Sequence, residues 1–196
     1  MFYSFFKLVA ILILKAVFGL QVFDRENIPK KGGFILASNH VSYLDPIVLG
    51  AACSRKLNFM AKQELFSNAF FSWFISNLGS FPVKRNATDL LALKEAMRRI
   101  KKGGGLLLFP EGTRRFDGVS CEPHGGVGFL ATKLDVPVVP AFIRGTDSAL
   151  PKGAKFMRPS QISVHFGKQI SVEKNSPYQD IARLVMANIR YIEENS

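Results

Sequence analysis

The chain has 196 residues, a length that suits one domain with a sizeable core and is too short for two comfortable ones. Hydrophobic residues make up 47% of it, which excludes a disordered chain and suggests that some apolar surface stays exposed. Lys and Arg outnumber Asp and Glu by 26 to 15, giving a net charge of +11, so we expect attraction to nucleic acid, anionic lipid headgroups or an acidic carrier protein. Cys53 and Cys121 fit neither a CxxC motif nor a disulfide framework, so the compartment is expected to be reducing.

The first 20 residues, MFYSFFKLVAILILKAVFGL, predict an amphipathic helix. Only seven uncharged residues separate Lys7 from Lys15, far fewer than the roughly 20 that a spanning helix needs. On a helical projection the two lysines, Ser4 and Gln21 share a sector of about 120°, and apolar side chains fill the rest. We expect residues 1–20 to anchor the chain in a membrane surface, facing the cytoplasm as a peripheral or monotopic protein. Packing on the protein's own core is the alternative, and a spanning helix also stays open.

Beyond residue 20, short apolar runs typical of strands alternate with stretches typical of helices. The predicted strands cover residues 33–39, 56–61, 79–85, 105–110, 136–145 and 161–170, and the predicted helices cover residues 45–53, 62–77, 88–105, 126–135 and 177–195. Asp45 and Pro46 suit the N-cap and the first position of a helix, and Pro82 is best tolerated near a sheet edge. The aromatic stretch 66–80 is either core or a second membrane contact. The alternation predicts an α/β domain over residues 21–196, with a largely parallel sheet flanked by helices on both faces.

Reactive groups of open α/β sheets gather beyond the carboxyl ends of the strands. Asn39-His40 and Asp45 lie at such a point, and so do Lys84-Arg85 and the string FPEGTRR, residues 109–115. We therefore expect these three groups to converge on one edge of the sheet.

His40 and Asp45 are the candidate catalytic residues. A tight turn between them would bring the carboxylate against the imidazole, fix its tautomer and raise the basicity of the second ring nitrogen. The sequence has no G-x-S-x-G elbow and no recognisable nucleophilic cysteine, so the substrate would supply the attacking hydroxyl. The alternative is that Asp45 merely caps its helix and His40 bonds locally. No cluster with ligand spacing predicts a metal.

The loop after the predicted strand 105–110 is typical of an anion site. Backbone amides around Gly112 can approach an anion, Thr113 adds a hydroxyl, and Arg114 adds a planar fork suited to phosphate. The pair Lys84-Arg85 supplies a second cationic arm, although each cation by itself is also compatible with a solvated surface charge. Glu111 either orients the arginines or bonds a substrate hydroxyl.

Four strings of this chain resemble the blocks of the glycerolipid acyltransferases, the family of glycerol-3-phosphate and lysophosphatidate acyltransferases. They are NHVSYLD (39–45), GSFPVKR (79–85), FPEGTR (109–114) and VPVVPAFIRGT (136–146). The resemblance implies acyl transfer from acyl-CoA or acyl carrier protein to a glycerophosphate hydroxyl. It implies that His40 takes the hydroxyl proton while Asp45 orients the imidazole.

The resemblance further implies that the acceptor's phosphate is bound by Arg85, Arg114, Gly112 and Thr113. It also implies that no metal or tightly bound cofactor is needed. The expected partners are a bilayer, a lysophosphatidate-like acceptor and the acyl donor, and no nucleic acid. We favour lysophosphatidate because it already resides in the membrane. Glycerol-3-phosphate and other lyso-lipids remain alternatives, as does a non-catalytic, basic lipid-binding protein. A nucleic-acid module is favoured by charge alone.

Two positions depart from the family's pattern. Lys84 stands where the second block commonly has an acidic residue, which strengthens anion attraction and removes an acceptor. After the third block, Pro123, His124, Gly125 and Gly126 replace a common Phe-Lys-x-Gly. Whether His124 takes over as a donor or is a loop histidine without a catalytic role stays open.

Overall fold

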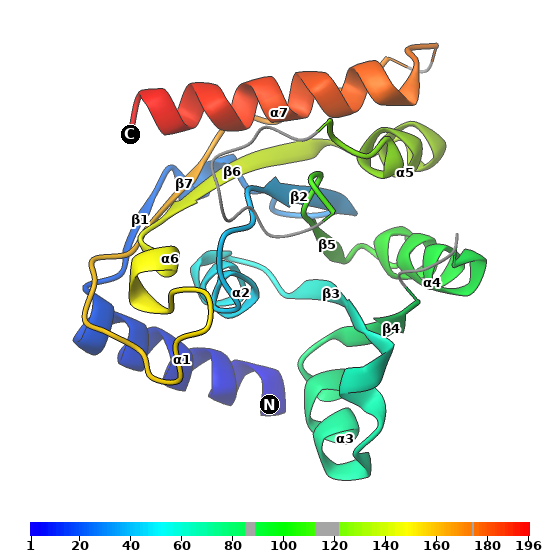
Figure 1. The fold of residues 1–196 in the computed structure, drawn as a ribbon. Helices are drawn as coiled ribbons and strands as arrows, with labels where there is room; N and C mark the ends of the chain where they lie inside the picture. The colour runs from blue at the N-terminus through cyan, green and yellow to red at the C-terminus, as the bar shows by residue number, and fades with distance from the viewer. Residues whose placement is uncertain (85–88, 113–121, 174) are drawn as a thin grey trace.

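A seven-stranded sheet organises the computed structural model, which describes residues 1–84, 89–112, 122–173 and 175–196 (Figure 1). Its strands are β1 (Gln21–Phe23), β2 (Phe34–Ser38), β3 (Leu57–Lys62), β4 (Ser80–Val83), β5 (Gly105–Leu108), β6 (Val138–Arg144) and β7 (Ser163–Phe166). They lie in the order β1-β7-β6-β2-β5-β3-β4, and each neighbouring pair is parallel except β6 with β7. The largely parallel sheet predicted from the sequence is confirmed.

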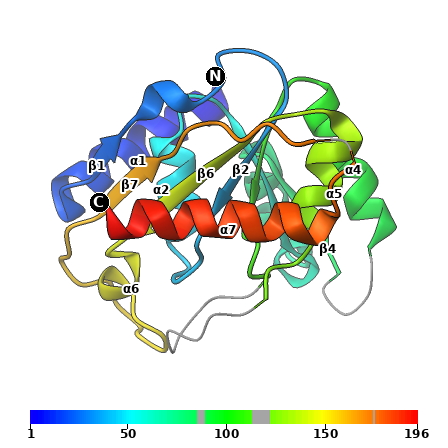
Figure 2. The ribbon, with the colours of Figure 1, turned by 90° about the horizontal axis from the view of Figure 1, so that it is seen from above.

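Helices cover both faces of the sheet. α1 (Phe2–Phe18) and α2 (Asp45–Ala52) pack on one face, and α4 (Leu90–Lys101), α5 (Gly126–Leu134) and α7 (Tyr178–Glu194) pack on the other. In Figure 2, α7 runs across the strands of that second face with α5 and α4 beside it. Strand β2 serves both cores, because Phe34 and Leu36 point to the α2 side while Ile35 and Ala37 point to the other.

Four features of the chain differ from the predicted elements. The short β1, the 3-10 helix η1 (Arg25–Asn27) and the helix α6 (Thr146–Ala149) have sequences too short to show a period. The predicted helix 62–77 divides into the end of β3, η2 (Gln63–Phe66) and α3 (Ala69–Asn77). The division falls at Asn68, whose side chain accepts the Phe71 N–H and caps α3. Pro82 lies in the edge strand β4, as predicted.

Helix α1 both packs on the domain and exposes an apolar face. Leu14 and Phe18 are buried in the core, and the Lys7 ammonium donates to the carbonyl oxygen of Cys53. The large apolar side chains of α1 that face outward are each at least half exposed: Phe5, Leu8, Leu12, Ile13 and Val17. The helix therefore packs on the protein's own core, the alternative given for residues 1–20, with one of its sides only. Among the described residues, no helix has the length and apolar character that crossing a bilayer requires.

Helix α3 contributes no buried side chain, so its aromatic residues are not core. Phe70 and Trp73 are 74% and 54% exposed. The helix contacts the start of α1, because Phe2 lies 5.3 Å from Trp73 between ring centroids and Phe6 lies 5.0 Å from Phe74. The exposed apolar faces of α1 and α3 are therefore adjacent. We call their outward residues the α1/α3 face: Phe5, Leu8, Leu12, Ile13, Val17, Phe70, Phe71 and Trp73.

Candidate active site

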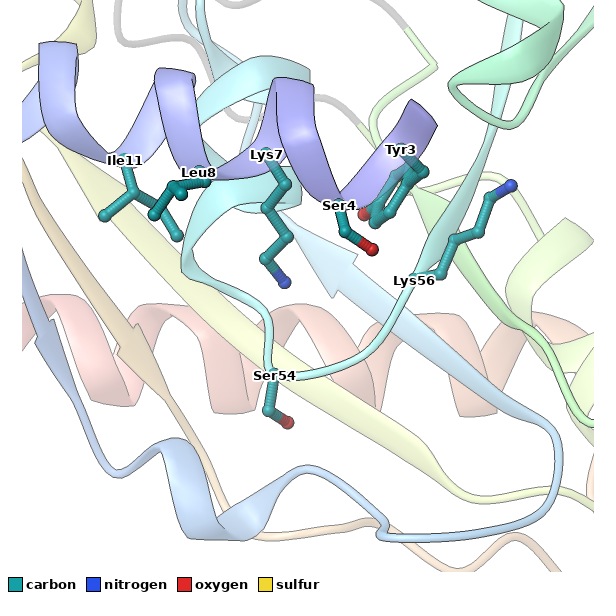
Figure 3. Close-up of a pocket in the computed structure, with 7 residues that line it drawn as sticks. All are labelled: Tyr3, Ser4, Lys7, Leu8, Ile11, Ser54 and Lys56. Carbon is teal, nitrogen blue, oxygen red and sulfur yellow. The ribbon is translucent and has the colours of Figure 1, made fainter. Parts of the chain in front are cut away.

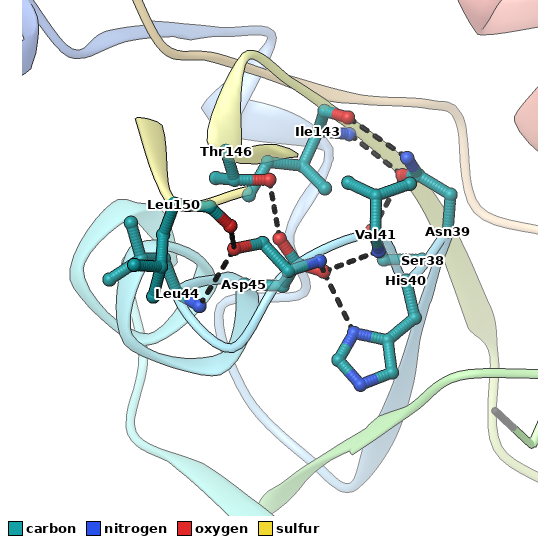
Figure 4. A network of polar contacts seen from close by, with 10 residues as sticks. Ser38, Asn39, His40, Val41, Leu44, Asp45, Ile143, Thr146 and Leu150 are labelled. Atoms are coloured by element: carbon teal, nitrogen blue, oxygen red, sulfur yellow. Dashed lines mark hydrogen bonds and ion pairs between the residues drawn. The ribbon is translucent and has the colours of Figure 1, made fainter. Parts of the chain in front are cut away.

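His40 and Asp45 lie together at the carboxyl end of β2, where the strand runs through a short loop into α2 (Figure 4). The imidazole Nδ1 is 2.7 Å from Asp45 Oδ2. Asp45 is fully buried and His40 is 9% exposed. A proton on Nδ1 donated to the carboxylate leaves Nε2 as the basic nitrogen, which is the arrangement of an oriented general base.

The loop between the two residues holds the Asp45 carboxylate. The backbone N–H groups of Val41 and Ser42 donate to the same oxygen, Oδ2, at 2.7 and 2.8 Å. The prediction that Asp45 is the helix N-cap is wrong, because Leu44 occupies that position without a side-chain bond. The carboxylate turns back across its own loop instead of onto the amides of α2, so its bonds hold the imidazole.

The turn that follows β6 supplies a contact that the sequence patterns do not predict. The hydroxyl of Thr146, just past the end of β6, donates to Asp45 Oδ1 at 2.5 Å. Asn39 joins the two strand ends, because its amide nitrogen donates to the Ile143 carbonyl and its amide oxygen accepts the Ile143 N–H, both at 2.9 Å. The signal for Thr146 was its place directly after a strand, but only the pairing of β6 with β2 brings it to Asp45.

Strand β5, the other neighbour of β2, delivers the loop Phe109 to Gly112 to the same edge. The Phe109 ring stacks on His40 with centroids 3.9 Å apart and planes 12° from parallel. Glu111 is buried, with 3% exposure. Gly112 has a φ of 70°, and a Cβ there would lie 2.5 Å from Cδ2 of His124. His124 therefore packs against the candidate anion loop, and a larger residue than glycine would be strained at this φ and would displace the imidazole.

The second cationic string lies farther from the dyad. Lys84 follows the edge strand β4, is exposed, and donates its backbone N–H to Asp89 at 2.9 Å. This bond is the largest of the contacts that hold the pKa of Asp89 below its usual value. Three strand spacings separate β4 from β2, roughly 14 Å. Lys84 thus shares the edge without contacting His40, and Arg85, Thr113 and Arg114 lie outside the described residues.

A shallow hollow of about 350 Å³ lies away from this edge (Figure 3). It is bordered by α1 and by the segment that leads into the amino end of β3, with these lining residues: Tyr3, Ser4, Lys7, Leu8, Ile11, Ser54 and Lys56. Burial lowers the pKa of Lys7, and nearby Arg25 lowers it further. Within the ranges that the structure describes, no group of three or more His, Cys, Asp or Glu is placed to hold a metal ion. Cys53 is a buried free thiol, whereas Cys121 lies outside the described residues.

An imidazole oriented by a buried carboxylate at the carboxyl end of a parallel strand suits an enzyme that activates a hydroxyl. Comparison with known proteins shows which class of enzyme this is. The family model described as Acyltransferase matches residues 19–144. The chain therefore belongs to the acyltransferase family and is an acyltransferase.

Individual relatives agree with this assignment. The chain is 32% identical over 138 residues to the 1-acyl-sn-glycerol-3-phosphate acyltransferase of Bacillus subtilis, covering 70% of this chain and 68% of that protein. It is 28% identical over 192 residues to the Streptococcus pneumoniae protein of the same name, covering 96% and 70%. The crystal structure of the 1-acyl-sn-glycerophosphate (LPA) acyltransferase PlsC from Thermotoga maritima matches with a TM-score of 0.82 and 28% identity, over 98% of this chain and 80% of that one.

Proposed function

We propose that this acyltransferase moves an acyl chain from acyl-CoA or acyl carrier protein to the free hydroxyl of lysophosphatidate, in phospholipid biosynthesis. The observation that carries the proposal is the 2.7 Å contact between His40 Nδ1 and the buried Asp45. The names of the relatives support the choice of acceptor. The acyl donor is proposed from the family resemblance alone.

The proposed chemistry is one direct transfer. His40 Nε2 takes the hydroxyl proton while the hydroxyl oxygen bonds to the thioester carbonyl carbon. The carbon–sulfur bond then breaks, and the sulfur leaves as a thiolate or takes the proton back from the imidazolium. Asp45 keeps the proton on Nδ1 and stabilises the imidazolium as it forms. The substrate supplies the nucleophile, so the proposal needs no acyl-enzyme, metal or tightly bound cofactor.

The proposed substrate-binding residues are Lys84, Arg85, Glu111, Gly112, Thr113 and Arg114, of which the structure describes Lys84, Glu111 and Gly112, each just after the carboxyl end of a strand. The left-handed backbone of Gly112 supports this role, because a glycine there lets a phosphate approach main-chain amides. The cations would attract the phosphate, with Lys84 acting at longer range.

We propose that residues 1–20 anchor the enzyme on the cytoplasmic surface of a membrane and that α3 adds to the same contact. The α1/α3 face exposes large apolar side chains over two touching helices, which is the kind of surface that enters the boundary between headgroups and acyl chains. Lys7 and Lys56 line the hollow beside α1, where anionic headgroups would meet them. An anchored enzyme meets a lipid acceptor within the membrane plane.

The deciding experiment is an acceptor panel with one labelled acyl thioester. The purified protein is offered lysophosphatidate, glycerol-3-phosphate and a lyso-lipid without an exposed phosphate, first with acyl-CoA and then with acyl carrier protein. We expect the highest kcat/KM with lysophosphatidate. Preference for glycerol-3-phosphate would replace the proposed acceptor, and no transfer to any hydroxyl with either donor would overturn the proposal.

A further inference from the structure

The Asp45 carboxylate is held from two directions. One oxygen, Oδ2, takes its bonds from the adjoining loop: the imidazole and the N–H groups of Val41 and Ser42. The other oxygen, Oδ1, takes a bond from Thr146, which is 101 residues farther along the chain. Asp45 and Thr146 both have 0% exposure, so water cannot replace the hydroxyl.

The fold places Thr146 by a specific turn. β6 lies parallel to β2, with Ser38 opposite Ala141, and the Asn39 side chain pairs with the Ile143 backbone just before the turn. Gly145 makes the turn with a φ of 86°, and a Cβ there would lie 2.0 Å from the Gln161 carbonyl oxygen. The conformation of Gly145 thus turns the backbone so that residue 146 lies against Asp45.

We propose that Thr146 is a positioning residue, whose hydroxyl fixes the rotation of the Asp45 carboxylate so that Oδ2 stays on Nδ1 of His40. The inference rests on the proposed function, in which His40 is the base. Loss of the hydroxyl leaves Oδ1 buried without that donor. The carboxylate then gains by turning Oδ1 toward the donors now held by Oδ2, which weakens its hold on the imidazole.

The kinetic test compares Thr146→Val, Thr146→Ser and Thr132→Val. The first change removes the hydroxyl at nearly constant volume, the second keeps it, and the third makes the same chemical change at a buried hydroxyl that has no hydrogen-bond partner in the described part of the chain. Thr146→Val should lower kcat by roughly 10- to 100-fold with little change in KM. Thr146→Ser should restore most of that activity, and Thr132→Val should leave it unchanged.

A cycle with Asp45→Asn separates positioning from a general effect on folding. If Thr146 acts through the carboxylate, Thr146→Val should cost much less in the Asp45→Asn background than in the wild type. Equal losses in both backgrounds would overturn the proposal. So would a Thr146→Ser variant as impaired as Thr146→Val while both show the melting temperature of the wild type.

A spectroscopic measurement keeps the test independent of the substrate. The ¹⁵N shifts of the His40 ring, recorded without substrate, should show mainly the Nδ1–H tautomer in the wild type and in Thr146→Ser, and a mixture in Thr146→Val. An unchanged tautomer in a folded Thr146→Val protein would refute the positioning role. If the acceptor panel fails while the tautomer still responds, the proposed function falls and the link between Thr146 and His40 stands.

Discussion

The carboxyl edge of the sheet and the α1/α3 face depart from the ordinary protein surface in opposite ways. At the edge, the polar groups of His40, Asp45 and Thr146 are buried and bonded to one another. On the α1/α3 face, apolar side chains such as Leu12 and Phe70 are exposed. Buried polar groups need hydrogen-bond partners, and these three find them in one another. Large exposed apolar surfaces attract other molecules, so the α1/α3 face is where we expect the membrane to bind.

The variant His40→Ala is expected to separate the two regions most clearly, because it should nearly abolish turnover and leave membrane binding intact. This change removes the proposed base and should lower kcat by about 1,000-fold, within the usual range for a general base. Binding to phosphatidylglycerol vesicles should not change, because His40 lies off the α1/α3 face. The matched control is His165→Ala, at a histidine of β7 that stacks on Phe23 and is separated from β2 by strand β6. A folded His40→Ala protein with undiminished turnover would contradict the assignment.

The converse change acts on the α1/α3 face. The double variant Leu8→Asp/Leu12→Asp should weaken co-sedimentation with phosphatidylglycerol vesicles by about 100-fold, since each leucine that enters the membrane contributes about 1.5 kcal/mol or more. Turnover of a short-chain, water-soluble acceptor should be nearly unaffected. Leu90→Asp/Leu91→Asp makes the same change at two exposed leucines on α4, on the opposite side of the sheet. Equal vesicle binding by both double variants would defeat the anchoring proposal.

The sequence predicted more of the carboxyl edge than of the α1/α3 face. The His40 to Asp45 spacing and the loop to Gly112 are local patterns, so their place at strand ends followed from the chain alone. Thr146 could not be assigned, because its contact depends on the order of strands in the sheet, which local periodicity does not determine. The N-cap error at Asp45 has a related cause: propensity shows that a carboxylate suits a helix start but not which amides it will accept. For α3, hydrophobicity could not separate core from exposed surface.

A smaller effect is expected where the candidate anion loop meets the rest of the edge. Gly112→Ala places a methyl group against His124 at a backbone φ of 70°, so the loop must shift. We expect the KM of the phosphate-bearing acceptor to rise by roughly 10-fold, with the donor KM unchanged. Gly126→Ala is the control, because a Cβ there meets no atom within 4 Å. A change confined to the donor KM would argue against phosphate binding at this loop.

The smallest effect is expected at an ion pair of α4, which belongs to neither region and so serves as a baseline for both. Bonds from Arg98 and, after it, Arg99 lower the pKa of Glu95 to about 2. Because this pKa lies below the unfolded value of 4.5, the ion pair stabilises the fold above pH 4.5, and the benefit is lost as the pH falls toward 2. Glu95→Gln should lower the free energy of unfolding by about 1 kcal/mol at pH 7, after allowance for solvent screening, and by almost nothing at pH 2. Urea unfolding at the two pH values measures the difference, and a loss of equal size at both would show that the glutamate acts through packing and not through its charge.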